Sequence, residues 1–211
     1  MLTFEEFFAA CAGVWRTERI YHYPQSGEVE RSYTEFRVAA LHEAAKQKIL
    51  SPYMSGELTI AAAALTSDAP SCPGFAIAFE TRSETGEEVS MSLSALFVPN
   101  VYITQPIELP KLPIAAQLAA SDEVIEGVYL RDEGYSEAGA IAGRFTYQPT
   151  RQTLEMTTYY RRSVAVDQMR LIAPTLRMRT IVTYQRPAAD ELPTTITLVG
   201  FGLEHRQVVA G

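Results

Sequence analysis

The sequence predicts one mainly β domain, an antiparallel sandwich or barrel. Nine short segments rich in aromatic and β-branched residues follow one another, and each tends to alternate polar and apolar side chains. Gly, Pro, Asp or Ser separates consecutive segments, and no regular strand-helix-strand alternation is present. A chain of 211 residues that is 47% hydrophobic can bury the core of one such domain over residues 1–211.

The first element is predicted to be a short helix over residues 3–12. Thr3 and Glu6 have the spacing of a capping box, in which the two residues bond each other's backbone N–H. Apolar residues at helical spacing are Phe4, Phe7, Phe8 and Cys11. Gly13 is expected to end the helix because glycine accepts the backbone angles of a C-terminal cap.

The rest of the chain has a strand-like period. The predicted strands are residues 15–23, 31–41, 74–82, 89–98, 127–135, 140–148, 153–163, 176–186 and 194–206. Two further helices are expected around residues 41–50 and 112–120. Residues 99–122 contain four prolines and are too long for a hairpin turn, so they predict an insertion at a barrel mouth, a partner-contact loop or a plain connector. Residues 187–193 are expected to be a hairpin loop.

Composition excludes several classes of function. The net charge of −7 and the pI near 5.1 argue against nucleic acid and anionic membranes as partners. No apolar run reaches the roughly 18 residues that span a bilayer, and the acidic N-terminus is unlike a secretory signal, so a cytoplasmic protein is expected. Cys11 and Cys72 are then expected to be reduced thiols. His22, His42 and His205 lack the spacing of a metal site, and no phosphate loop or nucleophile elbow is present.

One tripeptide favours a barrel over a sandwich. Gly13 and Trp15 form a G-x-W that follows the predicted helix and opens the first strand, which is typical of lipocalin-like barrels. Trp15 would close the bottom of the barrel. A cation from the last strands, Arg177 or Arg179, would stack on its ring.

Arg177 and Arg179 themselves allow two interpretations. They are two residues apart on a predicted strand, so both side chains project from the same face. They can lie in water, or they can point into a cavity, where guanidinium groups would match a ligand with carboxylates. Arg16 and Arg19 on the first strand are three apart, so at most one of them points inward.

Taken together, five blocks of the sequence resemble the S-type phycobiliprotein chromophore lyases, the CpcS/CpeS family. The blocks, in chain order, are Phe7 and Phe8 with Gly13, Trp15, Arg16, Thr17, Arg19 and His22; Gly127, Leu130, Arg131, Gly134, Tyr135, Ser136 and Glu137; residues 141–145; residues 173–180; and Phe201, Glu204 and Arg206. The match runs nearly from end to end, and five blocks in the right order are more specific than any one of them.

The resemblance implies a fold and a function. The fold would be a single antiparallel lipocalin-like barrel of about ten strands with a short N-terminal helix. The activity would be binding of an open-chain tetrapyrrole such as phycocyanobilin, as substrate and not as prosthetic group, and its attachment by a thioether bond to a cysteine of a phycobiliprotein α or β subunit. A homodimer, or a heterodimer with a paralogue, is also implied.

The resemblance also assigns residues. Arg177 and Arg179 would bind the two propionates of the bilin. The acids that would hold and protonate the tetrapyrrole are Asp167, Glu204 and Glu137. Further bilin contacts would come from Arg19, Arg16, Tyr135, Tyr159 and His22. Gly13 and Trp15 would be structural.

The sequence departs from the family pattern at several positions. Gln168 replaces an arginine, Thr158 an acid, Ile181 a serine, and Phe79 a tryptophan; Asp167 replaces a glutamate. These changes leave three alternatives to a lyase: a non-catalytic bilin carrier or heterodimer helper, a fatty-acid-binding type of carrier, and an assembly factor without ligand.

Overall fold

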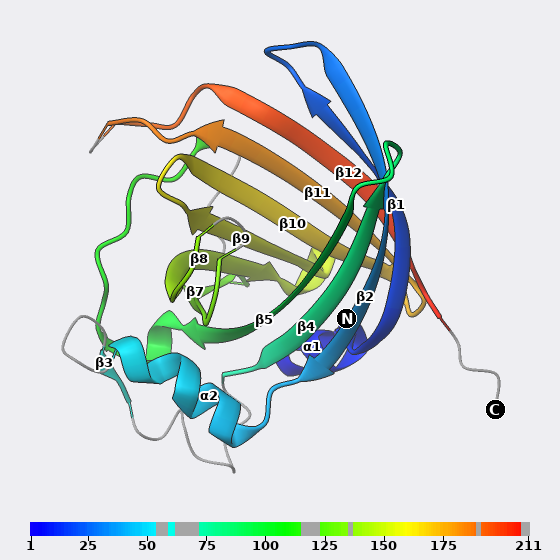
Figure 1. Cartoon of the computed structure of the whole chain (residues 1–211). Coiled ribbons are helices and arrows are strands. Elements are labelled where there is room, and N and C mark those ends of the chain that lie inside the picture. The colour runs from blue at the N-terminus through cyan, green and yellow to red at the C-terminus, as the bar shows by residue number, and fades with distance from the viewer. Residues whose placement is uncertain (54–58, 62–71, 115–122, 135–136, 189–190, 208–211) are drawn as a thin grey trace.

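The computed structural model describes residues 1–53, 59–61, 72–114, 123–134, 137–188 and 191–207. Its barrel strands are β1 (Gly13–Tyr23), β2 (Glu28–Ala40), β4 (Gly74–Ser83), β5 (Glu88–Pro99), β7 (Ile125–Arg131), β8 (Ile141–Gln148), β9 (Thr153–Tyr159), β10 (Ser163–Ala173), β11 (Leu176–Gln185) and β12 (Ile196–Arg206). They pair in antiparallel fashion in the order β1-β12-β11-β10-β9-β8-β7-β5-β4-β2, and β1 also pairs with β2, which closes the barrel (Figure 1). The predicted barrel of about ten strands is confirmed.

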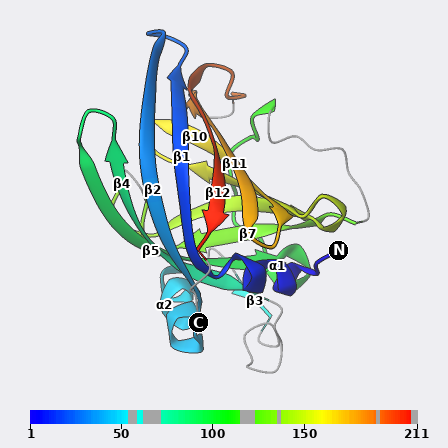
Figure 2. The same cartoon turned by 90° about the vertical axis from the view of Figure 1, so that its right-hand side faces the viewer.

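Helix α1 (Phe4–Cys11) lies across the end of the barrel where β1 begins (Figure 2). Thr3 caps it through the predicted capping box. Its buried phenylalanines share one hydrophobic cluster with inward-facing barrel residues such as Phe97 and Phe145. Gly13 follows the helix with a φ of 125°, in a region that favours glycine, and a Cβ there would lie 3.1 Å from the Arg206 guanidinium. The helix therefore closes this end of the barrel with an apolar plug.

A second hydrophobic cluster lies outside the barrel. Helix α2 (Glu43–Leu50), whose first turn is capped by His42, and the 3-10 turn Ser51–Tyr53 pack against outward side chains of β5 and β7. The buried outward residues of those strands are Leu96, Val98, Val128 and Leu130. Two of the helices expected from the sequence, 3–12 and 41–50, are thus present with slightly shorter bounds.

Residues 106–113, which we call the strap, run along the outer wall of the barrel. The strap directly follows β6 (Ile103–Gln105) in the chain. β6 pairs with β3 (Thr59–Ile60) in a short two-stranded sheet. Leu109 and Leu112 then pack against a cluster formed by the outward side chains of β9, β10 and β11. The described part of the long 99–122 segment therefore covers the wall. The helix expected at 112–120 lies almost entirely outside the described residues.

Strand β10 was not among the predicted strands, because its side chains do not follow the usual alternation of apolar residues inside and polar residues outside. Its inward face carries Asp167, which lines a polar part of the barrel interior. Its outward face carries Val164 and Val166, which are buried beneath the strap. In its first half, polar Asp167 inside and apolar Val164 and Val166 outside reverse the usual alternation, whereas Met169 in its second half belongs to the inner core. The predicted strand 153–163 therefore ran into a stretch that is in fact a turn followed by the start of β10.

Candidate functional site

The barrel encloses a cavity of about 380 Å³ that has two unlike walls. One wall, on β2, β4 and β5, is aromatic and aliphatic. Its lining residues are Phe36, Val38, Phe75, Ile77, Phe79, Leu93 and Ala95. The other wall, on β1, β10 and β11, carries the charged residues Arg19, Asp167, Arg177 and Arg179. The size is within the usual range of small-molecule pockets, about 300–1,000 Å³.

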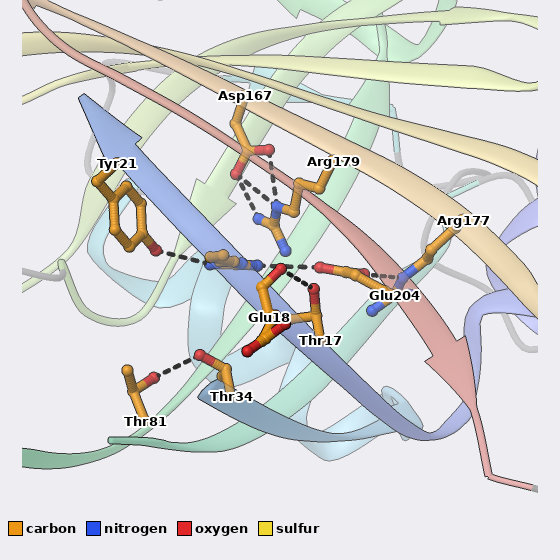
Figure 3. A network of polar contacts seen from close by, with 10 residues as sticks. Thr17, Glu18, Tyr21, Thr34, Thr81, Asp167, Arg177, Arg179 and Glu204 are labelled. Carbon is orange, nitrogen blue, oxygen red and sulfur yellow. Dashed lines mark hydrogen bonds and ion pairs between the residues drawn. The ribbon is translucent and has the colours of Figure 1, made fainter. Parts of the chain in front are cut away.

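Glu204 on β12 forms hydrogen bonds with two of the three arginines of the charged wall, Arg19 and Arg177; Figure 3 shows it beside Arg177. It is completely buried, and its Oε1 accepts a hydrogen bond from Arg19 Nη2 at 2.9 Å while its Oε2 accepts from Arg177 Nε. Burial alone would raise the pKa of Glu204, but the guanidinium groups of Arg177, Arg19 and Arg179 outweigh it and lower the pKa to about 2. The carboxylate therefore stays ionised at neutral pH.

Arg179 forms a second ion pair with Asp167 across the β10–β11 ladder. Its Nε lies 2.8 Å from Asp167 Oδ1 and 3.1 Å from Oδ2, and its Nη2 also donates to Oδ2. Arg177 and Arg179 both point inward and are only 1% and 8% exposed, so the interpretation with arginines in water is wrong. The fold supports the other interpretation, in which both guanidinium groups point into a cavity.

Trp15 forms the floor beside this network. Its side chain is fully buried, and its Nε1 donates to the Cys11 carbonyl at 2.9 Å. The Arg177 guanidinium stacks on the ring at 4.3 Å from the centroid, with the Arg206 guanidinium at 6.0 Å. Cys11 also lines the cavity, and burial raises the pKa of its thiol. Cys11 and Cys72 are both free, as expected.

Other residues singled out from the sequence lie away from the cavity. Arg16 is on the outer wall, where its Nε pairs with Glu35 at 2.8 Å. His22 is exposed on the same wall and its ring lies 6.0 Å from that of Phe201. Of the two arginines on β1, Arg19 is therefore the inward one.

Tyr159 and Glu137 also lie outside the charged wall of the cavity. Tyr159 is buried, but among the outward residues beneath the strap. Glu137 follows β7 in a loop, and its carboxylate accepts the backbone N–H of Arg161 at 2.5 Å. Tyr135 lies outside the described residues. The structure thus brings together Arg19, Asp167, Arg177, Arg179 and Glu204, and separates them from Arg16, His22, Glu137 and Tyr159.

Sequence reasoning missed a polar group on the opposite side of the cavity. Arg131, at the end of β7, is 3% exposed and lines the cavity, and its Nη1 donates to the Tyr160 hydroxyl at 3.0 Å. Tyr129 and Thr158 also line the cavity and share a hydrogen bond. Alternation along β7 was the available signal, since it places Tyr129 and Arg131 on one face.

Neither a metal cluster nor a membrane helix is found where the structure describes the chain. Within those ranges, no three His, Cys, Asp or Glu side chains group closely enough to hold a metal ion. None of the helices there has the length and apolar character needed to cross a membrane.

Comparison with known proteins identifies the family. The model of the CpeS-like protein family matches residues 3–106 and 113–207. The chain belongs to the CpeS-like family. A curated relative, chromophore lyase CpcS/CpeS 1 of Synechococcus sp. (strain JA-3-3Ab), is 38% identical over 209 residues, 96% of each chain. The solved S-type phycobiliprotein lyase CPES of Guillardia theta has the same fold, with a TM-score of 0.65 and 17% identity over 99% of this chain and 95% of that one.

Membership in the CpeS-like family confirms the resemblance seen in the five sequence blocks. It also confirms the prediction of an enzyme of the chromophore-lyase class. Apart from Phe7 and Phe8 in α1, the five blocks fall on β1, the β7–β8 region, β11 and β12, and most of the charged wall is drawn from these strands.

Proposed function

We propose that this protein binds an open-chain tetrapyrrole, such as phycocyanobilin, in its barrel cavity and attaches it through a thioether bond to a cysteine of a phycobiliprotein subunit. The reaction would take place in the cytoplasm and would need no prosthetic group. The observation that carries the proposal is the two-walled cavity in a relative of a curated chromophore lyase.

The two walls suit the two halves of a bilin's chemistry. The tetrapyrrole is a flat conjugated system, and aromatic side chains such as Phe36 and Phe79 offer it large apolar faces. The propionate arms are carboxylates, and arginine presents paired N–H donors to such groups. A fatty acid would use an apolar lumen and one cation, and would have no use for a wall that also contains buried acids.

The arginines are held in place before any ligand arrives. Glu204 fixes Arg177 and Arg19, and Asp167 fixes Arg179. Fixed side chains lose little further conformational freedom on binding. Arg177 also stacks on Trp15, so its role is to shape the floor as well as to add charge.

Asp167 is the acid that we assign to the pyrrole nitrogens. It is on the cavity lining, whereas Glu204 is completely buried behind Arg19 and Arg177. When a propionate approaches Arg179, it competes with Asp167 for the same guanidinium. The released carboxylate can then accept a pyrrole N–H and stabilise the protonated tetrapyrrole.

The bond-forming step needs no oxidant. The acceptor thiol would add across the exocyclic carbon–carbon double bond of the bilin's first ring. The S–H bond breaks, the sulfur bonds to the exocyclic carbon, the double-bond electrons move into the conjugated system, and the proton ends on the ring carbon of the former double bond, so nothing leaves. The nucleophile comes from the phycobiliprotein, so Cys11 is not required. The role of the protein would be to hold one conformer of the flexible bilin, with its reactive end toward the end of the barrel opposite α1.

An attachment assay tests this proposal. Purified protein would be mixed with phycocyanobilin and an apo-phycocyanin subunit, and covalent pigment would be detected on a denaturing gel by zinc-enhanced fluorescence. We expect a labelled subunit, and we expect Arg179→Gln to reduce labelling at least about tenfold because a charged hydrogen bond to the substrate is lost.

Arg37→Gln is the matched control, since Arg37 lies on the outer wall and pairs with Glu80. It should label as the wild type does. Binding of free bilin without labelling would instead favour the carrier or heterodimer-helper alternative, to be followed by addition of a paralogue. Absence of both binding and labelling would contradict the proposal.

A further inference from the structure

A second cavity lies outside the barrel, between the strap and the strands beneath it. Its volume is about 550 Å³, and none of the described residues that line it also lines the barrel cavity. One side is the outer face of β7, β8 and β9. The other side is apolar and comes from β6 and the strap: Ile103, Pro106, Ile107, Leu109 and Leu112. A pocket of this size can hold a small molecule.

Polar side chains on the outer face of β7, β8 and β9 form two neighbouring rows in this outer pocket. In the first row, Glu126, Thr146 and Glu155 are direct partners across the two ladders. In the second row, Arg144 is the direct partner of Thr157. The rows are two residues apart along the strands, which is about 6.4–6.8 Å. One row is therefore acidic and the other basic.

The acidic row has hydrogen-bonding capacity that the described residues leave unused. Glu155 is 4% exposed, and its carboxylate accepts a hydrogen bond from Gln168 Nε2 at 2.6 Å. Burial raises the pKa of Glu155, and no positive charge among the described residues opposes this shift. The Thr146 hydroxyl is buried and has no hydrogen-bond partner there. A ligand ammonium would supply donors to both groups together with a positive charge.

The basic row has a donor to spare. Arg144 donates from Nη2 to the Leu109 carbonyl at 2.8 Å, whereas its Nε is buried and has no hydrogen-bond partner among the described residues. Within the same part of the chain, Arg144 forms no ion pair, and Glu155 forms none either. A ligand carboxylate would accept from the Arg144 Nε and balance the guanidinium charge.

We infer that the outer pocket binds a small zwitterion with an apolar body, such as an aromatic α-amino acid. Its ammonium group would lie at the acidic row, its carboxylate at Arg144, and its apolar body beneath the strap. One carbon joins the two charged groups of an α-amino acid, and a hydrogen bond of about 2.9 Å at each end lets them reach both rows. A purely cationic or purely anionic ligand would serve one row and leave the other unpaired. This site is separate from the barrel cavity, so the inference does not rest on the proposed function.

Calorimetric titration with three indole compounds tests the inference. L-Tryptophan carries both charges, tryptamine carries only the ammonium, and indole-3-propionate carries only the carboxylate. We expect the wild type to bind tryptophan at least about tenfold more tightly than either analogue, because each analogue lacks one charged hydrogen-bonding group. Binding of an analogue as tightly as tryptophan would overturn the inference, as would absence of tryptophan binding.

Glu155→Gln separates the two ends of the site, since it keeps the size of the side chain and removes its charge. It should weaken tryptophan binding at least about tenfold and change indole-3-propionate binding by less than about twofold. Thr146→Val should cause a smaller loss for tryptophan, of about threefold to tenfold. Glu35→Gln, which removes an acid from another part of the outer wall, is the matched control and should bind as the wild type does. Equal losses for tryptophan and indole-3-propionate in Glu155→Gln would contradict the assigned role of Glu155.

Amide hydrogen exchange with and without tryptophan locates the ligand. Tryptophan should slow exchange in the strap and in β8, with little change in β1 and β11, which line the barrel cavity. Slower exchange in β1 and β11 instead would place tryptophan inside the barrel and overturn the inference.

Discussion

Glu204 shows how a single buried acid can position the charged residues around it. It lies on β12 with no exposure to solvent, yet it is ionised because two arginines donate to it and a third is near. An isolated carboxylate in this position would be neutral. The acid thereby keeps Arg177 against Trp15 and Arg19 over the ring of Phe36, with the guanidinium carbon 4.7 Å from the ring centroid.

This arrangement makes a prediction about stability and pH. The pKa of Glu204 is lowered to about 2 from its usual 4.5, so its ion pairs stabilise the fold fully above pH 4.5, and this stabilisation is lost as the pH falls toward 2. The size of the effect is of the order of 3 kcal/mol. We expect Glu204→Gln to lower the free energy of unfolding by about 3–5 kcal/mol at pH 7, because it leaves buried guanidinium charge without its counter-ion.

Urea unfolding of both proteins between pH 7 and pH 3 measures this effect. The difference between wild type and variant should shrink as the pH falls below 4.5. A difference that stays constant with pH would contradict the ionised state of Glu204. Glu35→Gln is the control, since Glu35 pairs with Arg16 and Arg37 on the outer wall and surface ion pairs contribute only about 0–1 kcal/mol.

At the scale of elements, sequence reasoning worked where each face of a strand has one environment. Helix 3–12 with its capping box, the first strand and the placement of Arg177 and Arg179 on one face of β11 follow simple periods, and the structure has them. Whether that face points into water or into a cavity was left open by the sequence. Strand β10 was missed because its first half places polar Asp167 in the cavity and apolar Val164 and Val166 beneath the strap, the reverse of the usual alternation. Arg131 was missed for a related reason, since only closure of the barrel shows that β7 faces β12.

The strap itself depends on the strands beneath it. Arg144, on the outer side of β8, donates from Nη2 to the Leu109 carbonyl at 2.8 Å and so joins the strap to the barrel wall. Leu109 and Leu112 add apolar contacts with the cluster around Val164.

We therefore predict that Arg144→Gln loosens the strap. The shorter side chain should leave the Leu109 carbonyl without this donor, which costs about 1–3 kcal/mol locally. Amide hydrogen exchange read by mass spectrometry should show faster exchange in residues 106–113, with little change in β1 and β12. Arg151→Gln, at an exposed turn, is the control and should leave the exchange of the strap unchanged. Unaltered strap exchange in Arg144→Gln would show that the apolar contacts alone hold it.

At the scale of the whole molecule, the barrel has one closed end and a second hydrophobic layer outside. Helix α1 plugs the end beside Trp15, so the floor of the cavity is apolar apart from the arginine network. Helix α2 and the strap cover the outside of β5 and of β7 to β11. The two cysteines divide between these layers: Cys11 is in the plug and lines the cavity, whereas Cys72 belongs to the outer cluster beneath α2.

This division provides a test of where the ligand binds. Burial raises the pKa of the Cys11 thiol and raises that of Cys72 to about 11, so both are largely protonated at pH 8, and both should react with iodoacetamide more slowly than an exposed thiol by at least about tenfold. Their labelling rates should rise as the pH is increased. Saturating biliverdin should slow the modification of Cys11 several-fold further, because a ligand in the barrel cavity would lie against that thiol, and should leave Cys72 unchanged. Peptide mapping by mass spectrometry reads both sites in one sample. Protection of both cysteines alike would indicate general stabilisation of the fold, and protection of neither would place the ligand outside the barrel.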